Sequence, residues 1–234
     1  MDWFREVNSY CERAGPGYWS EPVNALTNLA FVAAGLWAWR HAGRAGDRGG
    51  RLLAAILVAI GIGSWLFHTH AQVWAMMADV LPILVFILVY VFLATVRFFA
   101  LPAWVGALAV ALYFPWSMLI ERGLTPMVGT LNGSMSYVPV PTLIFLYAGL
   151  LARRRPETAR GLALGAALLC LSLLFRSIDQ AVCAAVPSGT HFLWHLCNAV
   201  LLGWMIRVMV RDREPEALRS ACSRRSDPAR IPAS

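Results

Sequence analysis

Long apolar stretches dominate the chain, and short polar segments separate them. Several of these stretches reach about 18 to 23 residues, enough for a helix to cross a bilayer core of about 30 Å. Capping and helix-breaking residues at their ends predict seven helices, over 22–39, 52–70, 75–96, 102–120, 136–152, 160–177 and 190–210. The pattern therefore predicts an all-α polytopic membrane protein built as a seven-transmembrane helix bundle.

The segments outside the apolar region differ at the two ends of the chain. No internal repeat or linker divides the helices, so residues 22–210 form one predicted transmembrane domain after an extracytoplasmic segment over 1–21. That segment has no basic region leading into a cleavable apolar stretch, and we expect no signal peptide. The tail over 211–234 mixes Arg, Ser, Pro and acids without apolar periodicity, which predicts a disordered cytoplasmic extension.

Charge adds the orientation. The 234 residues are 59% hydrophobic and carry a net charge of +7, and all twenty basic residues are arginine. Segments that follow the first, third, fifth and seventh predicted helices hold sixteen arginines, and the alternate segments hold four: Arg5, Arg13, Arg122 and Arg176. The positive-inside rule then predicts an outside N-terminus and a cytoplasmic C-terminus. Membrane topology explains the positive charge, so we expect no nucleic-acid partner. We expect the membrane to be a bacterial inner membrane.

In this topology, the strongly polar side chains within the spans lie at one depth in the membrane. Ser64 and His68 lie near the outer end of the second predicted helix, Asp79 lies one turn into the third, and His191 and His195 begin the seventh. Strongly polar groups inside a membrane are costly and normally face partners or a cavity. Five such groups at one level indicate a functional site on the extracytoplasmic side.

Their spacing favours a metal centre. Ser64 and His68 are four residues apart, as are His191 and His195, so each pair shares a helical face. Three neutral imidazoles suit a catalytic zinc, because they occupy three tetrahedral positions and leave the fourth for water. Asp79 follows His68 by eleven residues, across a short turn, where a carboxylate is placed to exchange a proton with that water.

Other interpretations of these residues stay open. A bis-histidine haem accounts for the histidines but leaves Ser64 and Asp79 without a role. A non-enzymatic receptor or regulatory protein with a structural zinc is a further alternative, and it too needs neither residue. Ser64 also fits a small packing residue between helices. We expect His70 and His41 to be interfacial or hydrogen-bonded residues instead of ligands.

The order of these motifs resembles the alkaline ceramidase family. Glu-Pro-x-Asn-x-x-x-Asn begins at Glu21, Gly-x-Gly-Ser-x-x-x-His ends at His68, Asp79 follows, and His-x-x-x-His ends at His195. That family comprises seven-helix membrane amidases in a superfamily that also includes the adiponectin-type receptors. The resemblance covers about Tyr10 to Arg207. It implies that His68, His191 and His195 hold zinc, that Ser64 assists near the metal, and that Asp79 is the acid/base.

The N-terminal segment departs from the family pattern. The family has a calcium-binding Asp-Trp-Cys-Glu-x-Asn sequence followed by a later Glu. Alignment on the cysteine keeps Glu12 and Glu21 as candidate calcium ligands but places Ser9 and Ala14 where the Asp and Asn would lie. Calcium prefers six to eight oxygen ligands, so the loss of two side-chain ligands weakens the site.

Each acidic residue of this region also has a structural interpretation. Glu12 pairs with a neighbouring arginine such as Arg13, and Glu21 caps the first helix at its proline-containing N-terminus.

Asp179, near the end of the sixth predicted helix, lies three residues after Arg176. An ion pair between them is one interpretation, and orientation of a zinc histidine or of the substrate head group is the other.

Sidedness also restricts the five cysteines. Cys11 and Cys183 both fall outside, Cys170 and Cys197 lie within the membrane, and Cys222 is cytoplasmic. Only the first pair shares an oxidising compartment. We therefore predict a disulfide bond between Cys11 and Cys183, which the family resemblance also suggests.

These observations converge on a zinc-dependent intramembrane amidase. It would hydrolyse the N-acyl amide of ceramide or a ceramide-like membrane lipid to a fatty acid and a long-chain amine. An apolar bundle with its metal near the outer leaflet suits a substrate with long acyl chains.

Overall fold

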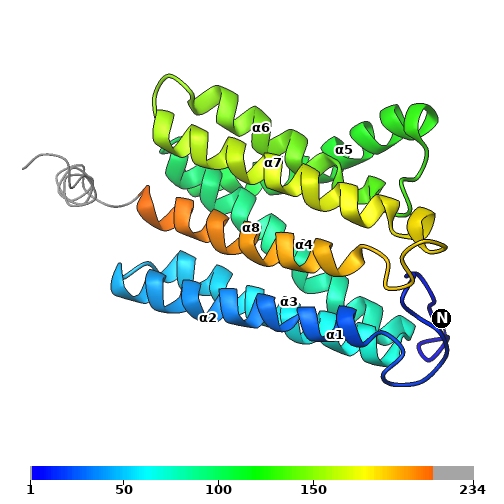
Figure 1. Ribbon diagram of the computed structural model, residues 1–234. Helices are drawn as coiled ribbons and strands as arrows, with labels where there is room; N and C mark the ends of the chain where they lie inside the picture. The colour runs from blue at the N-terminus through cyan, green and yellow to red at the C-terminus, as the bar shows by residue number, and fades with distance from the viewer. Residues whose placement is uncertain (1, 213–234) are drawn as a thin grey trace, which may run out of the picture.

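The computed structural model describes residues 2–212, in which a segment without α-helix over 2–21 is followed by α-helices joined by loops (Figure 1). The helices are α1 (Pro22–Thr27), α2 (Leu29–Arg44), α3 (Arg48–His70), α4 (Val73–Phe98), α5 (Ala103–Val128), α6 (Pro139–Leu151), α7 (Pro156–Ile178) and α8 (His191–Arg211), with short 3₁₀ helices η1 (Met135–Tyr137) and η2 (Gln180–Val182). Strand-type pairing in this part of the chain is limited to one bridge between Glu6 and Gln72. The predicted disordered tail and Cys222 lie outside the described residues, apart from the end of α8 and Asp212.

The all-α prediction is confirmed, although several helix ends differ from the predicted ones, most of all at the ends of α2 and α5. The first predicted helix is divided at Asn28 into α1 and α2, which together make one of seven helical segments. α2 continues to Arg44, past the predicted end at residue 39. α5 continues past the charged residues at 121 and 122 to Val128, where Gly129 with a φ of 74° ends it. The charged residues at 121 and 122, where the sequence predicted the end of the span, therefore do not end this helix.

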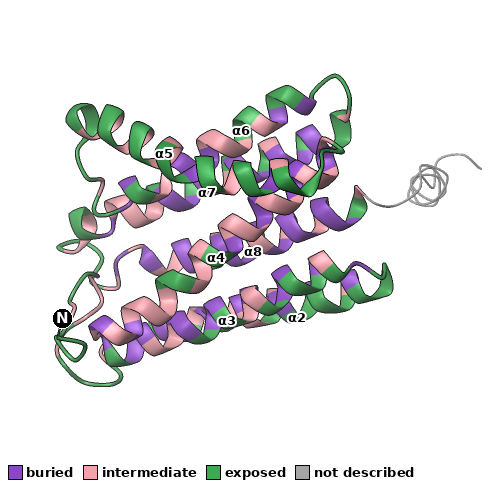
Figure 2. Ribbon diagram, turned by 180° about the vertical axis from the view of Figure 1, so that it is seen from behind, coloured by how far each residue is buried: buried purple, intermediate pink, exposed green. Residues whose placement is uncertain are grey.

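Five helices among the described residues have the length and apolar composition needed to cross a membrane: α3, α4, α5, α7 and α8. The apolar segment Met135–Leu151, which contains η1 and α6, is shorter. Large apolar side chains on many outer helix faces are exposed, and Figure 2 shows these faces in green. Such surfaces are typical of helices that face lipid.

Most of the packing in the bundle joins helices that follow one another along the chain. α3 packs between α2 and α4, α8 packs on α2 and α7, and α6 packs on α7. α5 contacts mainly α4, and only Gly106 and Tyr113 of this helix are buried. Small buried residues bring α2 and α3 together, among them Gly35, Ala38 and Ala54, as expected for helices that pack in a membrane.

Gly63 controls the closest approach of α3 and α4. A Cβ atom at this position would lie 2.0 Å from the Ala78 carbonyl oxygen and 3.1 Å from the Asp79 backbone nitrogen. Neither backbone atom is free to rotate away. The absence of a side chain at Gly63 therefore sets the separation between the helices that carry Ser64 and Asp79.

We expect Gly63→Ala to lower stability by about 1–3 kcal/mol, in the range for overpacked sites, because the helices must separate. Thermal unfolding of the purified protein measures the effect. Gly43→Ala in α2 is the matched control, since a Cβ there meets no atom within 4 Å. Equal stability of the two variants would contradict the proposed close contact.

Candidate metal centre

Three buried histidines meet where α3 ends and α8 begins. His68, His191 and His195 each offer a ring nitrogen, and these nitrogens all lie within 4.8 Å of one another. The ring centroids are 4.6 to 5.2 Å apart. This spacing leaves no room for a haem macrocycle between the rings, whereas a single ion fits among them. The structure thus brings together the three predicted ligands.

Neighbouring side chains fix two of the rings. Glu21 Oε2 lies 2.6 Å from His68 Nδ1, and Thr27 Oγ1 lies 2.9 Å from His195 Nδ1. When a metal-binding histidine donates one N–H to such a partner, its other nitrogen presents a lone pair to the ion. His68 Nε2 and His191 Nδ1 are buried without a protein partner. A buried polar atom without a partner costs about 1–3 kcal/mol of folding free energy. Three imidazole nitrogens are a donor set that suits zinc.

Thr27 was not foreseen as part of the site, although it lies three residues after Asn24 in the first motif. We expect Thr27→Val, which keeps the shape and removes the hydroxyl, to weaken zinc affinity by about 10- to 100-fold. Competition with a zinc chelator followed by metal analysis measures this. Thr69→Val is the matched control, because the buried Thr69 hydroxyl bonds only to the carbonyls of Trp65 and Leu66. Equal losses in the two variants would contradict the role of Thr27.

Ser64 and Asp79 lie next to the histidines on α3 and α4. Ser64 is buried one helical turn before His68, and its side chain interacts with the Asp79 carboxylate. Asp79 also interacts electrostatically with His68 and Arg176. A carboxylate and a hydroxyl therefore flank the place where the three imidazoles converge.

The N-terminal segment covers the histidines. The Tyr10 ring stacks on His191 at a centroid distance of 3.6 Å, and the Tyr10 hydroxyl accepts a hydrogen bond from Arg176 Nη1 at 2.9 Å. Burial raises the pKa of the Tyr10 phenol, which keeps it protonated. A disulfide bond between Cys11 and Cys183, with 5.4 Å between the Cα atoms, ties the segment to the loop before α8.

Glu12 and Glu21 have exchanged the structural roles that the sequence suggested. Glu12 accepts hydrogen bonds from the backbone N–H groups of Val23 and Asn24 and thereby caps α1. Glu21, the residue at the N-cap position, makes no capping bond and instead pairs with Arg13 and His68. Burial opposes ionisation of Glu21, but the bonds to His68 and Arg13 outweigh it and lower the pKa of this carboxyl. Calcium at these two residues remains a prediction that their contacts do not favour.

Asp179 orients a candidate ligand and is not paired with Arg176. Its buried carboxylate accepts the backbone N–H groups of Cys11, Thr190 and His191 at 2.7 to 3.0 Å. These bonds satisfy the first turn of α8 and fix where His191 begins the helix. The ion-pair interpretation was therefore wrong, and the orienting one describes the contacts.

Arg176 projects from α7 among aromatic rings near the histidines. Its guanidinium carbon lies 5.4 to 5.6 Å from the ring centroids of Tyr10, Tyr137 and Trp194, within the range of cation–π attraction. Arg176 also lines an open polar pocket with residues of the N-terminal segment. Sequence spacing suggested only a local partner for it, because these rings come from distant segments.

Fold and site together define a helical protein with membrane-length apolar segments and a buried three-histidine centre flanked by a hydroxyl and a carboxylate. The model of the ceramidase family matches residues 9–215, so the chain belongs to this family. No match was found among the curated proteins. Family membership supports a ceramidase-like hydrolase function with a lipid substrate.

Proposed function

We propose that this protein is a zinc-dependent intramembrane amidase that hydrolyses the N-acyl amide of ceramide or a ceramide-like lipid. The products are a fatty acid and a long-chain amine. The observation that carries the proposal is the buried His68, His191 and His195 cluster with Ser64 and Asp79 beside it. A purely structural metal site needs neither the hydroxyl nor the carboxylate.

The three histidines would hold the zinc, which when bound supplies Lewis acidity and makes water nucleophilic near neutral pH. Asp79 accepts a proton from the attacking water and later returns it to the nitrogen of the leaving amine. The Ser64 hydroxyl donates to the amide carbonyl oxygen as negative charge develops there. Glu21 and Thr27 keep the rings of His68 and His195 in place through both steps.

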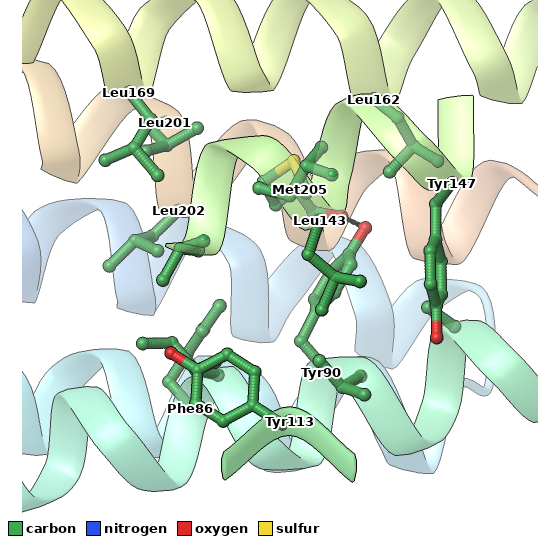
Figure 3. Close-up of a pocket in the computed structure, with 15 residues that line it drawn as sticks. Phe86, Tyr90, Tyr113, Leu143, Tyr147, Leu162, Leu169, Leu201, Leu202 and Met205 are labelled. Carbon is green, nitrogen blue, oxygen red and sulfur yellow. Dashed lines mark hydrogen bonds between the residues drawn. The ribbon is translucent and has the colours of Figure 1, made fainter. Parts of the chain in front are cut away.

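An apolar pocket inside the bundle supports a substrate with a long chain. Side chains of α4, α5, α6, α7 and α8 line it, among them Phe86, Tyr113, Leu143, Leu162, Leu201 and Met205 (Figure 3). Leu201 and Met205 follow His195 by six and ten residues on α8, which is about 9 and 15 Å along the helix axis. An acyl chain could thus extend from an amide at the histidines into this pocket.

We place the protein in a bacterial inner membrane with its site on the extracytoplasmic side, and arginine placement supports that side. Arg44 at the end of α2, Arg48 at the start of α3 and Arg211 at the end of α8 lie at the helix ends opposite the histidine cluster. If that end faces the cytoplasm, as the positive-inside rule requires, the metal centre faces the other side.

Mass-spectrometric assay of N-acyl lipids with the zinc-loaded protein tests the proposal. We expect release of fatty acid from a long-chain ceramide and little release from the matched N-acetyl analogue, which cannot fill the apolar pocket. If fully zinc-loaded protein cleaves none of a panel of long-chain N-acyl lipids, the non-enzymatic alternative replaces the proposal.

A further inference from the structure

Arg13 is buried in the N-terminal segment, and its guanidinium is surrounded by oxygen atoms. Only 4% of its side chain is exposed. Nε donates to Glu21 Oε1, Nη1 donates to the Gly15 carbonyl at 3.0 Å, and Nη2 donates to the His68 carbonyl at 3.0 Å. One carboxylate and two carbonyls are the kind of oxygen ligands that calcium takes, but here a side-chain cation occupies the space between them.

The carboxylates expected to bind calcium are fully engaged by protein donors. The two oxygens of Glu12 accept the backbone N–H groups of Val23 and Asn24 at 2.7 and 2.8 Å. The two oxygens of Glu21 face Arg13 on one side and His68 on the other. A divalent ion would have to displace these donors and approach the positive guanidinium, so these residues do not fit calcium.

We propose that Arg13 is a built-in replacement for a calcium ion and makes this protein independent of calcium. Its positive charge balances that of Glu21, and its planar guanidinium links the N-terminal segment to the end of α3 by hydrogen bonds. The substitutions at Ser9 and Ala14 agree with this inference, since a guanidinium that brings its own charge needs fewer acidic and amide ligands.

Arg13 is a positioning residue that acts through two contacts on His68. It holds the His68 carbonyl directly, and it holds Glu21, whose second oxygen lies 2.6 Å from His68 Nδ1. Loss of the guanidinium would leave the buried Glu21 Oε1 without its donor and would loosen the hold of Glu21 on His68. The inference rests on the proposed function only for the identity of the metal at His68.

Calcium titration of the purified, zinc-loaded protein tests the proposal with two readouts that do not require activity: equilibrium dialysis with radioactive calcium and the thermal unfolding midpoint. For the wild type we expect no stoichiometric calcium binding and no shift of the midpoint. Binding of one calcium per chain with a higher midpoint would overturn the proposal, and this arm needs no variant.

Variants then test whether the guanidinium and calcium are interchangeable. We expect Arg13→Ala to lower the unfolding midpoint and to weaken zinc affinity by about tenfold. The triple variant Ser9→Asp/Arg13→Ala/Ala14→Asn should regain stability only when calcium is added. Arg5→Ala, which removes an exposed arginine of the same segment, is the matched control and should behave as the wild type. Wild-type stability and zinc affinity in Arg13→Ala without calcium would overturn the proposal, whether or not the protein hydrolyses lipids.

Discussion

Replacing His195 by alanine is expected to remove zinc and, with it, hydrolysis. Two imidazoles cannot complete the three-nitrogen site, and the Thr27 hydroxyl loses the ring that it orients. We expect zinc content well below one ion per chain, and amide hydrolysis slower by about three orders of magnitude or more. Metal analysis and fatty-acid release from the same preparation measure both quantities.

His70→Ala is the matched control for this prediction. His70 ends the same helix as His68, but its side chain is exposed and contacts the rings of Tyr18 and Trp74. We expect one zinc per chain and wild-type hydrolysis in this variant. Full zinc occupancy in His195→Ala, or an equal loss in both variants, would contradict the assignment of the ligands.

The substitution Asp79→Asn should separate proton transfer from metal binding. Asparagine keeps the size and polarity of the side chain, but it cannot carry a proton between water and the leaving amine. We expect kcat to fall by about 10²- to 10⁴-fold while zinc content stays at the wild-type value. Single-turnover fatty-acid release and metal analysis together provide the measurement.

Asp47→Asn is the control for Asp79, because Asp47 is a buried aspartate at the opposite end of the bundle. It caps α3 and pairs with Arg97. Its loss should lower stability without slowing hydrolysis by the folded protein. If Asp79→Asn retains wild-type kcat, another group moves the proton and the proposed role of Asp79 is wrong.

The sequence predicted the histidine cluster because helical geometry constrains it strongly. A separation of four residues places His191 and His195 on one face of their helix, and the arginine distribution indicates which helix ends lie at the same depth. These two rules bring His68 to the same level without any knowledge of packing. The all-α fold follows from the same apolar pattern.

The contacts of the N-terminal segment could not be predicted in the same way. Residues 2–21 contain no α-helix, so no period relates the directions of their side chains. Glu12 therefore caps a helix that begins ten residues later, while Glu21, next to that helix, turns to Arg13 and His68. Local rules assigned each carboxylate to its nearest partner, and the loop conformation brought more distant partners together.

The partners of Asp179, in the segment between α7 and α8, could not be predicted from local sequence either. An arginine three residues earlier suggested a local ion pair, but the loop before α8 folds back on Asp179. Gly189 permits this contact, because its φ is 61° and a Cβ atom there would lie 2.1 Å from Asp179 Oδ1. Backbone donors at the start of α8 then compete successfully for the carboxylate.

Removal and return of zinc tests the central claim most directly. Purified protein should release fatty acid from long-chain ceramide, lose that activity when a chelator removes zinc, and recover it when stoichiometric zinc alone is restored. Hydrolysis that persists in metal-free protein, or protein that binds one zinc at the three histidines and still leaves the amide intact, would contradict the account.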